Sequence, residues 1–323
     1  MQVSEPFVKK ITPSRFFSIL FKIGVFLFSI GFIVFLLVDK KMWWDFLVQS
    51  YFNKKGFILL TCMIAAMFAN VSVEALKWQY LVRSTSELSF KTALTAVFSG
   101  IVAGLITPHG IGDYVGRILF LNPENRLQNI ASVLFSRIAQ LCITCITGIA
   151  ATLYFCFVIG IDQRLVVAFI LAVITLMAIF FMWKYRALWL DKMKHIPVLK
   201  NIENWFEQLR LYSNNLFLTT LALSALRYSV FLTQFVVLLL FFDVQLPIEI
   251  VIIGVIFTFF VKSIVPTFFD LGVRELAAVF FFSAYEIADE KVLAASISLW
   301  IINLLVPSII GLFCMFRIDY THK

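Results

Sequence analysis

The feature that most constrains this chain is a series of apolar segments, each long enough to cross a lipid bilayer. A helix rises 1.5 Å per residue, so about 20 apolar residues cross about 30 Å of hydrocarbon. Segments of this length occupy 16–38, 57–82, 130–160, 165–183, 216–242 and 292–316. We therefore predict an all-α polytopic membrane protein, because a helix satisfies its backbone hydrogen bonds within one segment when no water is present.

The composition supports one membrane domain. Of the 323 residues, 61% are hydrophobic and 14% are charged, and the mean hydropathy is +0.95. No polar stretch is long enough to build a soluble catalytic domain. We predict a single integral membrane domain over 1–323, with a cytoplasmic tail at 1–15 and a basic amphipathic cytoplasmic loop at 184–214.

Two other apolar regions, 91–121 and 248–284, are interrupted near their middle. Proline, glycine and charged residues break the first at 108–112 and the second at 266–272, and most of the resulting arms are too short to span a bilayer. A break at membrane depth is tolerated only where protein or a watery cavity satisfies the free backbone groups. We predict re-entrant hairpins or discontinuous helices around a cavity, giving eight or more membrane segments. Full helical pairs are the alternative.

The two interruptions contain the same residue types. GLITPHGIGDYVGR and VPTFFDLGVRE each place a proline, a glycine, an acid and an arginine around the start of a new helical arm, which suggests a degenerate inverted repeat. Helix N-termini and arginine side chains both suit anionic groups. The predicted head-group-binding residues are Pro108, His109, Gly112, Asp113, Arg117, Arg137, Arg227, Pro266, Gly272, Arg274 and Glu275.

Some of these residues also have a purely structural interpretation. Asp113 and Arg117 are four residues apart, which suits an intrahelical ion pair, and the nearby glycines would let helices approach closely. His109 beside a turn is more typical of a satisfied polar group than of a proton carrier.

The charges within the apolar spans leave a similar choice. Arg227 lies near the middle of its span, where a charge costs about 2.5–3.5 kcal/mol on the insertion scale. Two interpretations of Arg227 are open. It pairs with an acid such as Glu74 or Glu275, or it contacts a lipid phosphate. Glu74 also has Lys77 one turn further along, which favours a local ion pair.

The sequence predicts no cofactor, no metal site and no catalytic residues. The glycines at 110, 112 and 116 follow an apolar membrane segment instead of a β-strand, which argues against a dinucleotide site. No GxxxxGK[ST] motif is present for ATP hydrolysis, and Cys142-x-x-Cys145 has no second pair of ligands. A transporter is therefore favoured over an enzyme.

The net charge of +8 points to membrane lipids and not to nucleic acid, because lysine and arginine mainly flank the apolar runs. The positive-inside rule places the N-terminus, the C-terminus and the loop 184–214 in the cytoplasm. The loop 39–56 conflicts with this orientation, since its four lysines would lie outside.

Three stretches resemble the flippase-like membrane domain of lysylphosphatidylglycerol synthases, the multiple peptide resistance factor family. They are the run from Pro108 to Arg117, the segment SVLFSR ending at Arg137, and the run from Pro266 to Glu275. The resemblance covers about 16–318. Residues that match the family pattern are Gly112, Arg117, Arg137, Gly272 and Glu275, whereas Asp113, Ser136 and the stretch 267–270 depart from it.

The resemblance implies a stand-alone form of a domain that moves an aminoacylated phospholipid between leaflets in a bacterial or archaeal cytoplasmic membrane. It also implies that a separate soluble domain makes that lipid, so aminoacyl transfer is not expected here. We predict a lipid translocase that binds an anionic or aminoacylated head group between the two broken elements. A membrane-embedded enzyme acting on a lipid-linked substrate, and a scaffold for a separately encoded synthase, are the alternatives. The protein partner would be a second copy of the chain, forming a homodimer, or such a synthase.

Overall fold

The structure is a computed structural model that describes residues 50–105, 107, 110–158, 163–194, 206, 208–264 and 272–316. Every regular element within these ranges is a helix, so the predicted all-α class is confirmed. The predicted span 16–38 and the predicted site residues Pro108, His109 and Pro266 lie outside the described residues.

Four helices in the described ranges are long and apolar enough to cross a membrane, and a bent pair brings the number to five. The bent pair is α7 (Gln163–Lys184) and α8 (Arg186–Lys194), which meet at 77°. All the predicted spans after 16–38 coincide with helices, although eight or more membrane segments are not confirmed. The four long helices are α3 (Lys54–Val82), α6 (Ile130–Val158), α11 (Asn214–Phe241) and the continuous run of α14 (Asp289–Trp300), η3 (Ile301–Leu305) and α15 (Val306–Phe316).

The first predicted interruption is a break between two helices that pack against each other, α4 (Phe90–Leu105) and α5 (Gly112–Ile118). Their backbones come very close. A Cβ added at Gly112 would lie 2.0 Å from the carbonyl oxygen of Ala103, and one at Gly116 would lie 2.6 Å from the Cα of Gly100. Small residues therefore bring the two arms together, as in other tight membrane helix pairs.

The second predicted interruption separates α12 (Ile248–Ile264) from α13 (Val273–Ser283), which also pack together. Gly254 allows the close contact here, because a Cβ at this position would lie 2.6 Å from the ring of Phe282. Gly272, the N-cap of α13, has a φ of +97°, a backbone conformation that favours glycine.

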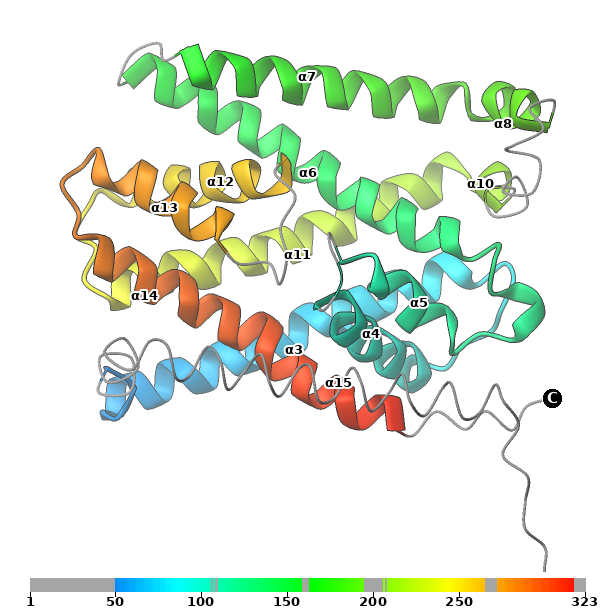
Figure 1. Cartoon of the computed structure of the whole chain (residues 1–323), viewed down its shortest axis with the longest axis horizontal. Helices are drawn as coiled ribbons and strands as arrows, with labels where there is room; N and C mark the ends of the chain where they lie inside the picture. The colour runs from blue at the N-terminus through cyan, green and yellow to red at the C-terminus, as the bar shows by residue number, and fades with distance from the viewer. Residues whose placement is uncertain are drawn as a thin grey trace, which may run out of the picture.

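The helices form a bundle in which α6 and α11 run through the interior, with α7 along one edge and α3, α14 and α15 towards the opposite edge (Figure 1). The largest apolar core joins α3, α4 and α11 to α12, α13 and α14. Large apolar side chains also face outward, including Phe180 and Phe313, as expected of helices that contact lipid. The short helix α10 (Gln208–Leu211) precedes α11 and packs on α6 and α8.

Candidate functional site

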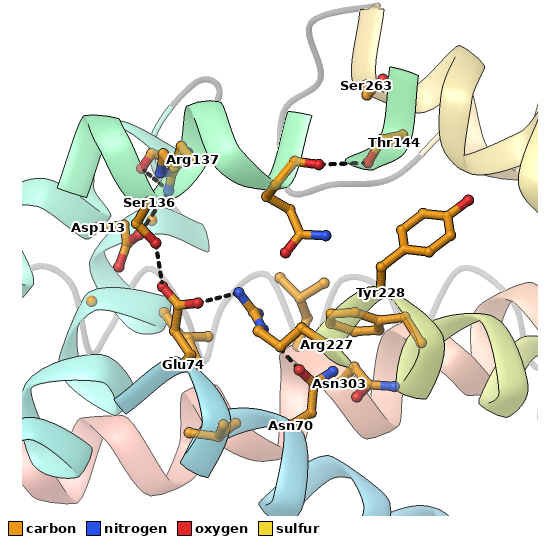
Figure 2. A pocket seen from close by; sticks show the side chains of 18 of the residues that line it. Asn70, Glu74, Asp113, Ser136, Arg137, Thr144, Arg227, Tyr228, Ser263 and Asn303 are labelled. Carbon is orange, nitrogen blue, oxygen red and sulfur yellow. Dashed lines mark hydrogen bonds and ion pairs between the residues drawn. The ribbon is translucent and has the colours of Figure 1, made fainter. Parts of the chain in front are cut away.

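A cavity of about 450 Å³ lies inside the bundle and is lined by residues of both broken elements and of the long helices. The labelled side chains in Figure 2 come from α3, α5, α6, α11, α12 and η3 and surround one common space. Two acidic residues and six basic residues line it. The charged lining residues are Glu74, Asp113, Lys77, Arg117, Arg137, Arg227, Lys262 and Arg274.

Glu74 of α3 is the centre of this charge cluster. Its Oε1 accepts hydrogen bonds from Arg117 Nη1 at 2.6 Å and from Ser136 Oγ at 3.1 Å. Its Oε2 contacts Lys77 Nζ at 2.8 Å and Arg227 Nη1 at 2.5 Å. One buried carboxylate thus joins α3, α5, α6 and α11, and both of the ion-pair alternatives raised for Glu74 and Arg227 are confirmed.

Asp113 and Arg117 of α5 form the predicted intrahelical pair. Arg117 donates from Nε to Asp113 Oδ1 at 2.6 Å and from Nη2 to Oδ2 at 2.9 Å, a bidentate arrangement. Arg137 of α6 reaches the same carboxylate, with Nη2 at 2.9 Å from Asp113 Oδ2 and 2.9 Å from the carbonyl oxygen of Gly110. The start of α5 is therefore held to α6 by a side chain that lines the cavity.

Arg227 lies near the middle of α11, and its guanidinium is fixed on two sides. Nη1 pairs with Glu74, and Nε donates to Asn70 Oδ1 at 2.7 Å. The ring of Phe231 lies 5.5 Å from the guanidinium carbon. The guanidinium plane is therefore oriented by an acid, an amide and an aromatic ring, while 21% of the side chain remains exposed, so part of it faces the cavity.

Lys77 is the most deeply buried of the cations, with only 1% of its side chain exposed. Besides Glu74, it donates to Ser224 Oγ of α11 at 3.3 Å. The six interacting charged residues, Glu74, Asp113, Lys77, Arg117, Arg137 and Arg227, include two acids and four bases. The cluster thus has more positive than negative charge, which favours an anionic ligand in the cavity.

Arg274 and Glu275 form a separate cluster at the start of α13. Arg274 donates from Nη2 to Glu275 Oε1 at 2.6 Å and from Nε to Ser296 Oγ at 2.8 Å. Glu275 Oε2 accepts from the backbone N–H of Gly272 at 2.8 Å, so this carboxylate caps its own helix. Arg274 lines the cavity, whereas Glu275 and Gly272 are not among the lining residues.

The structure therefore brings several predicted residues together and separates others. Like Gly272 and Glu275, Gly112 does not line the cavity. Its N–H donates to Thr107 Oγ1 at 2.7 Å. Predicted residues that line the cavity are Asp113, Arg117, Arg137, Arg227 and Arg274.

The predicted binding set left out Glu74, Lys77, Asn70 and Ser136, which line the same cavity. Asn70, Glu74 and Lys77 are spaced four and three residues apart on α3, which puts them on one face of that helix. This polar face within an apolar span was the available signal. It does not by itself show which helices supply the partners.

The last helix lines the cavity through a π-helical turn, η3, which contains Asn303. Pro307 lies two residues after the end of this turn, and proline cannot donate the backbone hydrogen bond that a regular helix needs at that position. Single π turns inside α-helices often occur at functional sites. Among the described residues, no group of three or more His, Cys, Asp or Glu side chains is arranged to hold a metal ion.

These features define the protein as a helical membrane protein with a charge-lined internal cavity. Residues 18–311 match the family model described as the lysylphosphatidylglycerol synthase TM region, and the chain belongs to this family. The expectation from the short motifs is thereby confirmed at the level of the family. Comparisons with curated proteins and with solved structures gave no match.

Proposed function

We propose that this protein is a lipid translocase that holds an anionic or aminoacylated phospholipid head group in its internal cavity. The observation that carries the proposal is the Glu74-centred charge cluster, which borders a cavity of about 450 Å³ between the helices of an apolar bundle. Charged groups at membrane depth are costly and commonly mark the path of a polar substrate. The family membership supports a role linked to lipid modification.

The broken elements suit such a path. Helices α4 and α5 border the cavity through Gly104 and Asp113, and the pair α12 and α13 borders it through Lys262 and Arg274. In the proposed arrangement both pairs are re-entrant, related as a degenerate inverted repeat, and enter the membrane from opposite sides. Rocking of one pair against the other would alternate access while the acyl tails stay in the bilayer.

We further propose that the protein lies in the cytoplasmic membrane of a bacterium or archaeon, with both termini and the basic loop 184–214 in the cytoplasm. Membrane lipids would be its ligands, and a second copy of the chain or a separately encoded synthase would be its protein partner.

Reconstitution into vesicles tests this function. The full chain is placed in liposomes that contain a fluorescent phospholipid, and a membrane-impermeant reductant measures how much of the probe reaches the outer leaflet. We expect translocation with the unchanged protein and a loss of at least about tenfold with Arg117→Gln, which removes a cation bound to both buried acids.

The matched control is Lys291→Gln, which removes a cation from the exposed pair with Asp243. This variant should translocate lipid at the unchanged rate. Vesicles that show no probe movement above protein-free liposomes would contradict the proposal. A chemically altered lipid without movement would indicate a membrane-embedded enzyme instead.

A further inference from the structure

The two carboxylates that face the cavity already have their hydrogen-bonding capacity occupied by the protein. A carboxylate offers about four acceptor positions. Glu74 uses four of them for Arg117, Ser136, Lys77 and Arg227. An ammonium group entering the cavity would have to displace one of these donors before Glu74 could bind it.

Asp113 is similarly occupied. It accepts two hydrogen bonds from Arg117 and one from Arg137. Its Oδ1 also lies directly against α4, because a Cβ added at Gly100 would be 2.2 Å from that oxygen. The cavity therefore has little acidic surface left for a cationic head group.

Hydrogen-bond donors, in contrast, are left over where Asn70 meets Arg227. Asn70 is 1% exposed and uses its Oδ1 to accept from Arg227 Nε, and this bond orients the amide. Its Nδ2 is buried and has no hydrogen-bond partner among the described residues. Arg227 uses Nε and Nη1, and no hydrogen bond from Nη2 to a described residue is observed. An unpaired buried donor costs about 1–3 kcal/mol, so a ligand acceptor would remove an existing penalty.

We infer that this cavity selects a lipid whose head group carries a phosphodiester and no cationic group, with the phosphate oxygens accepting from Asn70 Nδ2 and Arg227 Nη2. The inference rests on the proposed function and narrows it to one substrate class. Both side chains line the cavity, and Figure 2 shows them side by side. Glu74 acts as a positioning residue that holds Arg227. The net positive charge of the surrounding cluster disfavours an aminoacylated lipid by like-charge repulsion.

Binding to the full chain in detergent tests the inference separately from transport. The probes are dioctanoyl phosphatidylglycerol, its lysyl ester, dioctanoyl phosphatidylethanolamine and inorganic phosphate. We expect the anionic lipid to bind at least about tenfold more tightly than each of the other three, because only it combines an unneutralised phosphodiester with acyl chains. Equal or tighter binding of the lysyl ester or of phosphatidylethanolamine would overturn the selectivity. Inorganic phosphate binding as tightly as the lipid would overturn the assignment to a lipid head group.

The variant Asn70→Asp gives the sharpest contrast. It keeps an oxygen for Arg227 Nε but replaces the unpaired donor by a charged acceptor. Binding of the anionic lipid should fall by at least about tenfold, and binding of the lysyl ester should increase. The matched control is Asn53→Asp at the N-cap of the same helix. At this position asparagine and aspartate accept the Gly56 N–H equally well.

Unchanged binding of the anionic lipid to the Asn70→Asp variant would overturn the inference. The comparison of the four probes on the unchanged protein decides the selectivity even if that variant does not fold. If the anionic lipid binds selectively but no lipid moves in vesicles, the proposed translocation is wrong and the binding inference stands.

Discussion

At the residue scale, Glu74 is the side chain on which the buried charges depend. Three cations and one hydroxyl contact its two oxygens, and the residue is 3% exposed. Taking charges out of water is expensive, and ion pairing recovers that cost only when the partners are in place. Removing the acid would leave the three cations close together with less negative charge to balance them.

Glu74→Gln should therefore destabilise the protein by about 3–5 kcal/mol, the range for breaking a buried ion pair. The measurement is thermal unfolding in detergent. A control is Glu87→Gln on the loop before α4, outside the cavity, which should leave the midpoint unchanged. Adding Lys77→Met to Glu74→Gln removes one unpaired cation. The double variant should therefore lose less unfolding free energy than the sum of the losses measured for the two single variants. Equal midpoints for Glu74→Gln and Glu87→Gln would argue against a central role for this acid.

At the element scale, glycines set how closely α4 and α5 pack. Gly100 and Gly116 face each other across the pair, and the space for a side chain is absent at Gly112 and Gly116. Gly104 lies at the same interface but is less crowded, because an added Cβ would have the Cβ of Asp113 as its nearest neighbour at 3.3 Å. The position of Asp113, and through it the contact with Arg137, depends on this close approach.

Gly116→Ala should push α5 away from α4 and cost about 1–3 kcal/mol, as overpacking does in other cores. Gly104→Ala should be nearly neutral, because a small steric cost is offset by the gain of about 1 kcal/mol from replacing glycine within a helix. Thermal unfolding and lipid binding of both variants would be measured together. If the two substitutions have the same effect, the spacing of the α4–α5 pair does not control the site.

At the scale of the whole molecule, the cavity exists because segments distant in the sequence converge on it. Asn70 and Arg227 are 157 residues apart, and Glu74 and Arg117 are 43 residues apart. The proposed inverted relation of the two broken elements predicts that their breaks approach the cavity from opposite faces of the membrane.

Single cysteines introduced by Ile111→Cys and Ser263→Cys, in a background without the native cysteines, test that topology. Ile111 lies directly before α5, and Ser263 lies near the end of α12 and lines the cavity. A membrane-impermeant maleimide should label the two positions from opposite sides of sealed vesicles. Labelling of both from one side, or of neither from any side, would contradict re-entrant elements that face a shared cavity.

The local pattern of apolar, glycine and proline residues determined the helical class, the positions of the described spans and the two interruptions. These properties follow from span length and from backbone chemistry, which are local. The Asp113–Arg117 pair and the Glu74–Lys77 pair were also within reach, because helical spacing alone brings such residues together.

Only the tertiary structure decided which acid pairs with Arg227, that Glu275 caps its own helix, and that Asn70 belongs to the site. The physical reason is that a buried charge needs a partner, but the sequence does not say which helix brings it. The two interruptions and the polar face of α3 are visible in the sequence, and the packing of the helices turned them into one cavity with spare donors and occupied acids.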